Sequence, residues 1–271
     1  MISTAGPIGG RLDLGRRAGD VVPPLVVFIA VVLVWEIGLT VLGVKQFLLP
    51  KPSVILAAVQ EQQSILLQGL TYTGIEALGG LVAGVILGLA AAFAIARWAT
   101  AREVLMPLAV AASSVPIIAF APITSAWFSS QNPMARIAIV SVMVFFPVVV
   151  NTVRGLTSVD PAAVELMRSY AASDMAILRR LRIPNALPYF FTALKISATL
   201  AVIGAVIGEY FGGPRYALGI YISSEAYVFR YPNAWAGILM ACILGITFYL
   251  TVVVIERIAI PWQTAKRGAE T

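Results

Sequence analysis

The sequence contains no histidine and a single cysteine, Cys242, and charged residues make up only 12% of its 271 positions. Without histidine, the chain lacks the most common general base and metal ligand of proteins, and no clustered cysteine or acidic set replaces it. A lone cysteine forms no intramolecular disulfide, and Cys242 lies in an apolar run, where a thiol packs as a small hydrophobic group. We therefore expect no catalysis within this chain.

Hydrophobic residues account for 59% of the sequence, and its mean hydropathy is +0.90. Such a chain has too little polar surface to cover a soluble globule of this size, so we expect it in a bilayer. The net charge of +6 could indicate nucleic-acid binding. However, the basic residues stand in short clusters between apolar runs and form no continuous basic face. We attribute them to membrane orientation and expect no nucleic-acid partner.

Six apolar runs approach the roughly 20 residues that cross a bilayer as a helix. The first follows three arginines, as in a signal peptide, but it extends from Val21 to Val44 without a cleavage-type end. We therefore expect an uncleaved first span. The six expected spans are 23–43, 72–96, 104–128, 134–153, 188–211 and 234–257.

An even number of spans places both termini on the same side of the membrane. With both termini in the cytoplasm, thirteen lysines and arginines lie inside and five outside, as the positive-inside rule requires. The expected organisation is a cytoplasmic tail, a transmembrane domain that contains a cytoplasmic loop, and a second cytoplasmic tail. These parts are residues 1–20, residues 21–258 with the loop at 154–187, and residues 259–271.

The longest polar interruption, residues 160–188, falls in that loop. Asp160 followed by Pro161 favours a helix start, with the carboxylate as N-cap and proline at the first helical position. Glu165 and Arg168 are three residues apart and can pair on one face of this helix. The pattern therefore predicts a short amphipathic helix.

A second helical pattern follows in the same loop. Met175, Leu178 and Leu181 recur at helical spacing with arginines between them, and Pro184 is expected to end the helix. From spacing alone, an amphipathic loop on lipid headgroups is equally favoured, because its arginines are attracted to anionic lipid.

Residues 165–173, ELMRSYAAS, followed by LRIPNALP at 181–188, resemble the "EAA" loop of ABC importer permeases. In that family the segment reads roughly E-A-A-x-x-x-G-A-S and is followed, after a spacer, by h-x-L-P. Leu166 and Met167 replace the two alanines here. Ala171 stands where the family usually has the glycine that turns the chain between two short helices, and a positive φ is costly for alanine.

Two further segments are similar to branches of that family. FLLPKP at 47–52 resembles the F-L-P-S-P phrase of nitrate, sulfonate and taurine permeases, with Lys51 in place of serine, and residues 53–68 could then form an interfacial helix. IGAVIGEYFGGP at 203–214 resembles members that handle pyrimidine precursors, riboflavin or related aromatic heterocycles. We prefer the second class, because only Lys195 provides a basic residue inside a span for a small anion.

The resemblance implies an all-α membrane protein, a six-transmembrane-helix type I ABC importer permease bundle with a cytoplasmic coupling-helix loop. It further implies a homodimer in the bacterial inner membrane, with two cytoplasmic ATPase subunits and an extracytoplasmic solute-binding protein. The chain has no G-x-x-x-x-G-K-[ST] motif, so ATP and Mg²⁺ would be bound by the partner ATPase. The implied ATPase-contacting residues are Glu165, Leu166, Met167, Arg168, Ser169, Ala171, Ala172 and Ser173.

Candidates for the transport pathway come from polar residues at membrane depth. The third run contains three prolines, which free backbone carbonyls, and several hydroxyls, although a kinked packing helix explains any single one of them equally well. Carboxylates in spans are expensive unless they face protein or water, and each could simply pair within the bundle. The candidates are Ser113, Ser114, Pro116, Thr124, Ser125, Glu36, Glu76 and Glu209.

Three glycines four residues apart, Gly80, Gly84 and Gly88, predict close packing of the second span against another helix. A gradient-driven secondary transporter that uses Glu36, Glu76 and Glu209 is the alternative function, but it leaves the loop at 160–188 unexplained. A membrane-embedded enzyme has little support, because no nucleophile, paired-carboxylate or metal-ligand set occurs at useful spacing.

Overall fold

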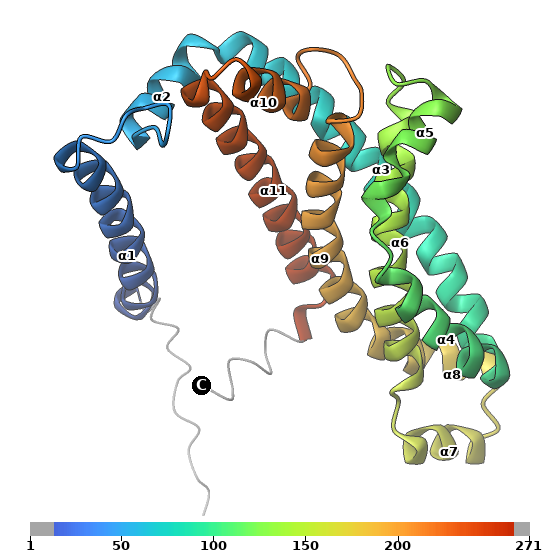
Figure 1. Cartoon of the computed structure of the whole chain (residues 1–271). Coiled ribbons are helices and arrows are strands. Elements are labelled where there is room, and N and C mark those ends of the chain that lie inside the picture. The colour runs from blue at the N-terminus through green and yellow to red at the C-terminus, as the bar shows by residue number, and fades with distance from the viewer. Residues whose placement is uncertain (1–13, 263–271) are drawn as a thin grey trace, which may run out of the picture.

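The computed structural model describes residues 14–262, which form helices joined by loops and contain no strand (Figure 1). The tails expected at 1–20 and 259–271 lie for the most part outside these residues, and the first helix begins at Leu14, inside the first tail. The helices are α1 (Leu14–Val41), α2 (Pro52–Glu61), α3 (Gln63–Arg97), α4 (Ala99–Ser113), the 3₁₀ helix η1 (Ile117–Phe120), α5 (Ala121–Phe128), α6 (Met134–Thr157), α7 (Pro161–Ser169), α8 (Asp174–Ile177), the π-helical turn η2 (Leu178–Arg182), α9 (Ile183–Glu209), α10 (Leu218–Tyr227) and α11 (Tyr231–Ala259).

Within the described residues, five helical stretches are long and apolar enough to cross a membrane. They are Val22–Val41, Gln63–Arg97, Met134–Thr157, Asp174–Glu209 and Tyr231–Ala259. Helices α3, α6, α9 and α11 share a buried core, in which Val140, Val144 and Val148 of α6 belong to one cluster with Ala201 and Ala205 of α9. Side chains from four helices thus exclude lipid and water from the centre of the bundle.

The close contact between α3 and α6 depends on the three glycines of α3, as their spacing predicted. A Cβ atom at Gly84 would lie 2.6 Å from the carbonyl oxygen of Ser141, and one at Gly88 would lie 2.9 Å from Cβ of Val148. Gly80 faces Val140 in the same way. Because glycine lacks a Cβ, the two backbones can approach closely, and the packing interpretation of this stripe is confirmed.

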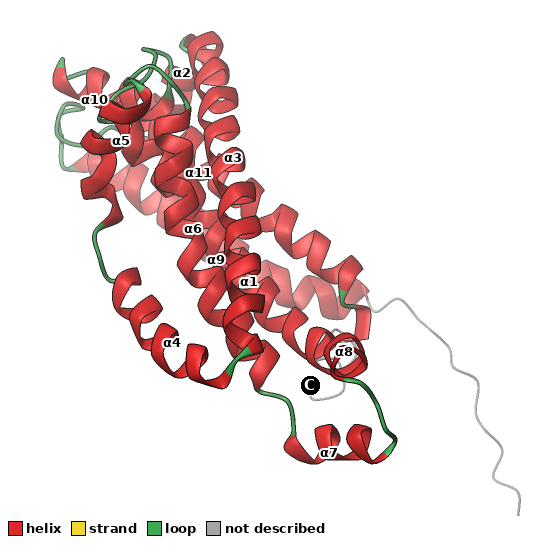
Figure 2. Cartoon of the chain, turned by 90° about the vertical axis from the view of Figure 1, so that its right-hand side faces the viewer, coloured by secondary structure: helices red, strands yellow, loops and turns green. Residues whose placement is uncertain are grey.

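The segment 104–128, expected as one span, is built from three pieces. Helix α4 ends at Ser113, and α5 begins only after the short helix η1. Pro116 has no backbone N–H, and the chain turns there through a hydrogen bond from the N–H of Ala119 to the carbonyl of Pro116, of 2.8 Å. Figure 2 shows α4 beside the bundle, joined to the rest by an extended link.

The expectation that Pro184 ends the second loop helix is wrong. Helices α8, η2 and α9 follow one another without interruption from Asp174 to Glu209. The N–H of Ile183 bonds to the carbonyl of Leu178, five residues earlier, so the chain widens into a π turn just before the proline. Pro184 then falls in the first turn of α9, directly after the π turn, whose widened hydrogen-bonding pattern accommodates a residue without an N–H inside the continuous helix.

Helix α7 lies below the bundle in Figure 1, connected to it only by short links. Its start is as predicted, because the Asp160 carboxylate accepts a hydrogen bond of 2.9 Å from the N–H of Ala162. Its end is a turn in which the N–H of Ala172 bonds to Met167 and that of Ala171 to Arg168, at 3.0 and 2.9 Å. This is the hydrogen-bond pattern of a Schellman motif, and Ala171 has the positive φ, +55°, that the pattern requires.

Helix α1 stands apart from the bundle and reaches it through α2 (Figure 1). Two contacts attach the C-terminal part of α1 to the rest of the protein. The rings of Trp35 and Trp235 meet edge to face with centroids 5.5 Å apart, and the Glu36 carboxylate accepts bonds from the N–H and hydroxyl of Ser53, at 3.0 and 2.7 Å. The apolar side chains of its span are largely exposed.

Candidate functional site

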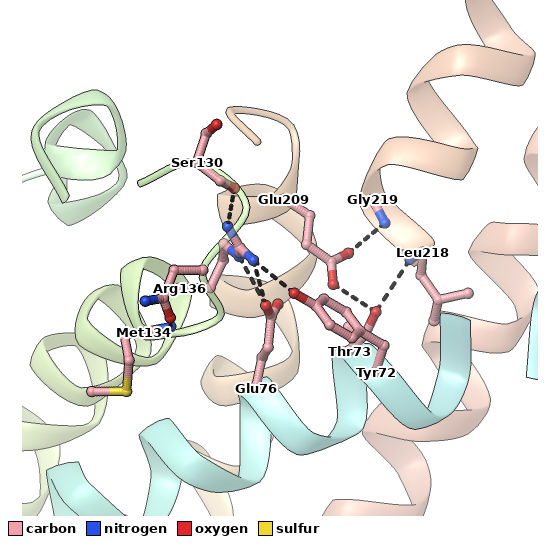
Figure 3. Close-up of polar contacts among 10 residues, drawn as sticks. Tyr72, Thr73, Glu76, Ser130, Met134, Arg136, Glu209, Leu218 and Gly219 are labelled. Carbon is pink, nitrogen blue, oxygen red and sulfur yellow. Dashed lines mark hydrogen bonds and ion pairs between the residues drawn. The ribbon is translucent and has the colours of Figure 1, made fainter. Parts of the chain in front are cut away.

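A buried polar cluster lies where α3, α6, α9 and α10 meet, at the end of the bundle remote from α7 (Figures 1 and 3). At its centre, Arg136 of α6 pairs with Glu76 of α3, with Nη2 2.8 Å and Nε 2.9 Å from Oε1 of the carboxylate. Both side chains are fully buried. An ion pair without access to water depends on good geometry, since each partner alone is costly to bury.

The remaining donors of Arg136 are also engaged. Nη1 donates to the carbonyl of Ser130 at 2.6 Å, and Nη2 donates to the hydroxyl of Tyr72 at 3.0 Å. The guanidinium is therefore held from three directions, by α3 and by the link before α6 (Figure 3). Charge-assisted bonds of this kind are the stronger ones in proteins, so they fix the relative position of α3 and α6 at this end.

Glu209, the last residue of α9, accepts hydrogen bonds from two neutral groups and from no charged group within residues 14–262. The hydroxyl of Thr73 donates to Oε1 at 2.7 Å, and the N–H of Gly219 donates to Oε2 at 2.6 Å. Thr73 in turn accepts from the N–H of Leu218 at 3.2 Å. Two N–H groups at the start of α10, which would otherwise lack partners, are thus satisfied by side chains of α3 and α9.

The structure brings together two of the three carboxylates chosen as pathway candidates, Glu76 and Glu209, and places Glu36 elsewhere, at the start of α2. Arg136, one of the five basic residues expected outside the membrane, at the start of the span 134–153, belongs to α6 and is fully buried. The feature of the sequence that could have identified Arg136 as a buried residue is its position three residues after Pro133, at the start of an apolar run. Its partner is 60 residues away, beyond the reach of spacing arguments.

A cavity of about 290 Å³ lies at the break between α4 and η1. Its lining includes Ser113 and Pro116 from the predicted set, with Met143 and Phe146 of α6. Gly204 of α9 faces Met143, because a Cβ there would lie 2.7 Å from the sulfur. Pro147, also in the lining, has no N–H to donate to the Met143 carbonyl four residues before it, which leaves this oxygen as an acceptor.

The other hydroxyl candidates do not line this cavity. Thr124 is buried and bonds to the carbonyl of Ala121 at 3.0 Å, while Ser114 caps α4 and is exposed. Ser125 is half-buried in α5. Ser113 itself donates to the carbonyl of Val110 at 2.6 Å, so its hydroxyl oxygen is left as an acceptor toward the cavity.

A larger groove, of about 580 Å³, runs between α9 and α11 and is almost entirely apolar. Thr199 and Tyr249 also border a second hollow that reaches Lys195. Lys195, expected to extend to lipid headgroups, instead pairs with Glu256 of α11 at 2.8 Å. The pair ties α9 to α11 at the end of the groove.

Helix α7 offers an unpacked surface, since none of its residues is buried. Leu166 is 59% exposed, and Glu165 and Arg168 form no ion pair within the part of the chain that the structure describes. Ser173 caps α8 by accepting from the N–H of Ala176 at 3.3 Å. A short capped helix with one apolar side and free charges is suited to dock on another protein.

These features define a helical membrane protein whose long helices enclose cavities and which presents one short helix away from the bundle. The chain belongs to the family described as "Binding-protein-dependent transport system inner membrane component", which its residues 80–263 match. It is therefore an ABC importer permease component, as the loop at 165–188 indicated, and its family is not one of catalytic enzymes. Among the described residues, no group of three Cys, Asp or Glu side chains could hold a metal ion.

Individual relatives agree with this assignment. The chain is 30% identical over 249 residues to the formylaminopyrimidine transport permease protein ThiX of Halalkalibacterium halodurans, covering 92% of this chain and 98% of that one. It is 26% identical over 233 residues to the riboflavin transport system permease protein RibX of Chloroflexus aurantiacus, covering 85% and 86%. The putative aliphatic sulfonates transport permease protein SsuC of Bacillus subtilis is also 26% identical, over 271 residues, covering 96% and 92%.

A crystal structure of an amino acid ABC transporter with histidines resembles this fold with a TM-score of 0.59. The sequences are 17% identical, and the match covers 74% of this chain and 97% of that chain. The similarity confirms the type I permease fold predicted from the sequence.

Proposed function

We propose that this permease imports a small aromatic heterocycle, of the pyrimidine-precursor or riboflavin type, rather than a sulfonate, taurine or nitrate. Relatives named for formylaminopyrimidine and riboflavin transport support this preference, although a sulfonate permease is similar as well. The charges of the bundle favour the heterocycle. Arg136 and Lys195 are both neutralised by carboxylates, so neither offers free positive charge to a small anion.

The cavity at the break between α4 and η1 is our proposed part of the pathway. Phe146 and Met143 provide a ring and a thioether, which pack favourably against an aromatic ligand. The Met143 carbonyl and the Ser113 hydroxyl oxygen add two acceptors for ring N–H or amino groups. An apolar site with a few placed polar groups is the usual composition of a small-molecule site.

Helix α7 and the turn after it are the proposed contact with the ATPase, from Glu165 to Ser173. Leu166 and Met167 would provide the apolar centre of the contact, with Glu165 and Arg168 at its rim. This assignment places α7 and both termini in the cytoplasm, and it leaves ATP and Mg²⁺ to the partner subunits. A solute-binding protein would then deliver the substrate at the opposite end of the bundle.

The continuous helix from α8 to α9 offers a direct mechanical link between these two ends. It begins beside α7 and ends at Glu209 in the buried cluster, with a π turn but no break between them. ATP-driven movement of α7 would therefore tilt α9 as a rigid rod and open the cavity alternately to each side. A homodimer is proposed from the family resemblance, and the apolar groove between α9 and α11 offers a hollow into which a helix of the second chain would pack.

The test is transport by the purified complex. The tagged chain is isolated from its native membrane, its partners are identified by mass spectrometry, and the complex is reconstituted with labelled pyrimidine precursor, riboflavin and taurine. We expect an equimolar P-loop ATPase and ATP-dependent uptake of a heterocycle. Phe146→Ala should lower this uptake at least about tenfold, equivalent to about 1.4 kcal/mol of lost binding. Exposed Phe93→Ala on α3 serves as the control.

Two outcomes would contradict the proposal. Uptake of taurine but not of any heterocycle would reverse the substrate assignment. Transport by the chain alone, without ATP, would make it a gradient-driven carrier instead.

A further inference from the structure

The buried cluster has more negative than positive formal charge. Glu76 and Glu209 are two carboxyls, Arg136 is the single guanidinium, and all three side chains are fully buried. The other groups that face the two carboxyls are neutral, namely the Tyr72 and Thr73 hydroxyls from α3 and the Gly219 N–H from α10. Two ionised carboxylates would leave one unit of negative charge without a partner or water, which is strongly unfavourable.

Arg136 does not compensate Glu209. Its bonds go to Glu76, to the Ser130 carbonyl and to the Tyr72 hydroxyl, and none reaches Glu209. Glu209 is therefore the carboxyl that lacks a cation. Its two hydrogen bonds from neutral donors stabilise it far less than a buried ion pair does.

The second carboxylate oxygen of Glu76, Oε2, indicates how the excess negative charge is neutralised. Oε1 takes both contacts from Arg136, whereas Oε2 is buried and has no donor among the described residues. Thr73, whose hydroxyl bonds to Glu209, lies one turn before Glu76 on α3, so the two carboxyls lie over the same face of that helix. Two carboxyl groups that share one buried site do not both ionise, because the like charges disfavour the second negative charge.

We propose that Glu76 and Glu209 share one buried proton, carried by Glu209 and donated to Oε2 of Glu76. The proton makes the cluster neutral, satisfies the free oxygen of Glu76 and leaves the Arg136 ion pair intact. It also adds a contact between the end of α9 and α3, beside the hydrogen bond from Thr73 to Glu209. The site is thus a protonation-dependent latch that holds α3, α6, α9 and α10 together at the end remote from α7.

The latch has a definite dependence on pH. In the unfolded chain Glu209 is ionised at neutral pH, so the folded protein binds one proton more than the unfolded protein. Stability therefore falls as pH rises, and it is highest on the acid side of neutrality. Once the proton is lost, two like charges stand in one buried site without water, and their repulsion pushes α9 away from α3.

Two matched substitutions test the proposal in the full-length protein. Glu209→Gln replaces the protonated carboxyl by an amide of the same shape. Its oxygen can still accept from the Gly219 N–H, while its NH₂ group can donate to Glu76 and to the Thr73 hydroxyl oxygen, so the unfolding temperature in detergent should stay close to that of the wild type. Glu76→Gln removes the counter-ion of Arg136 and should lower it on the order of 10 °C. Equal losses in both variants, or a larger loss in Glu209→Gln, would overturn the proposal.

Infrared spectroscopy gives a direct measurement on the wild-type protein. At neutral pH it should show the carbonyl-stretch band of a protonated carboxyl, shifted in D₂O and missing in Glu209→Gln, while Glu256→Gln, from the Lys195 ion pair, leaves it unchanged. Raising the pH from about 6 to about 9 should lower the unfolding temperature of the wild type and not that of Glu209→Gln. A wild-type spectrum without this band would show that both carboxyls are ionised and the proposal is wrong.

Discussion

Arg136 and Glu76 form an ion pair of 2.8 Å with both side chains fully buried, although 60 residues separate them in the chain. Removing one partner leaves the other charge buried without a counter-ion and without water. We expect Arg136→Met to destabilise the protein by about 3–5 kcal/mol, seen as a lower unfolding temperature in detergent. Lys195→Met is the matched control, because its pair with Glu256 is about one-fifth exposed and should contribute only about 1 kcal/mol. A similar loss in both variants would mean that burial does not strengthen the Arg136 pair.

The elements predicted correctly from the sequence depend on neighbouring residues. The N-cap at Asp160 followed by proline and the glycine stripe of α3 are both local patterns, and the resemblance at 165–173 is a short motif. Each of these features can be recognised in the sequence because its physical cause lies within a few residues.

The features that the sequence did not show depend on tertiary context. Arg136 at the head of an apolar run looks like a loop residue until Glu76 is placed beside it by the packing of α3 on α6. Pro184 normally ends a helix, but the π turn before it puts the proline in a first turn instead. The cavity at Ser113 depends on how α4 leaves the bundle, which hydropathy alone does not determine.

The glycines of α3 yield a second prediction. Gly84→Ala should destabilise the protein by about 1–3 kcal/mol, because the new Cβ would lie 2.6 Å from the Ser141 carbonyl and 2.7 Å from Cβ of Val144, so α3 and α6 must separate. Gly38→Ala is the control, since its Cβ would meet nothing within 4 Å. It should be neutral or stabilising by up to about 1 kcal/mol, because alanine favours helices. Thermal unfolding of both variants measures this, and equal behaviour would argue against close helix contact at Gly84.

Alanine-to-glycine substitutions in α7 and in the turn after it should have opposite effects on local stability. Ala171 has a φ of +55°, which costs a residue with a side chain about 1–2 kcal/mol, so Ala171→Gly should stabilise the turn locally. Ala163→Gly, inside α7, should destabilise the helix by about 1 kcal/mol. Hydrogen–deuterium exchange of residues 160–175 should slow in the first variant and accelerate in the second. Faster exchange in Ala171→Gly would show that the loop does not adopt this Schellman turn in solution.

The proposed ATPase contact predicts a separation of ATP hydrolysis from uptake. Glu165 lies exposed on α7 and pairs with no cation among the described residues, so Glu165→Lys should leave the fold intact. It reverses a charge at the proposed interface, where like charges in close contact cost several kcal/mol. We expect substrate uptake in proteoliposomes to fall at least about tenfold, with the unfolding temperature unchanged. Glu103→Lys makes the same charge reversal at an exposed position of α4 and should retain uptake. If Glu165→Lys transports at the wild-type rate for each ATP hydrolysed, α7 is not the element through which the ATPase drives the permease.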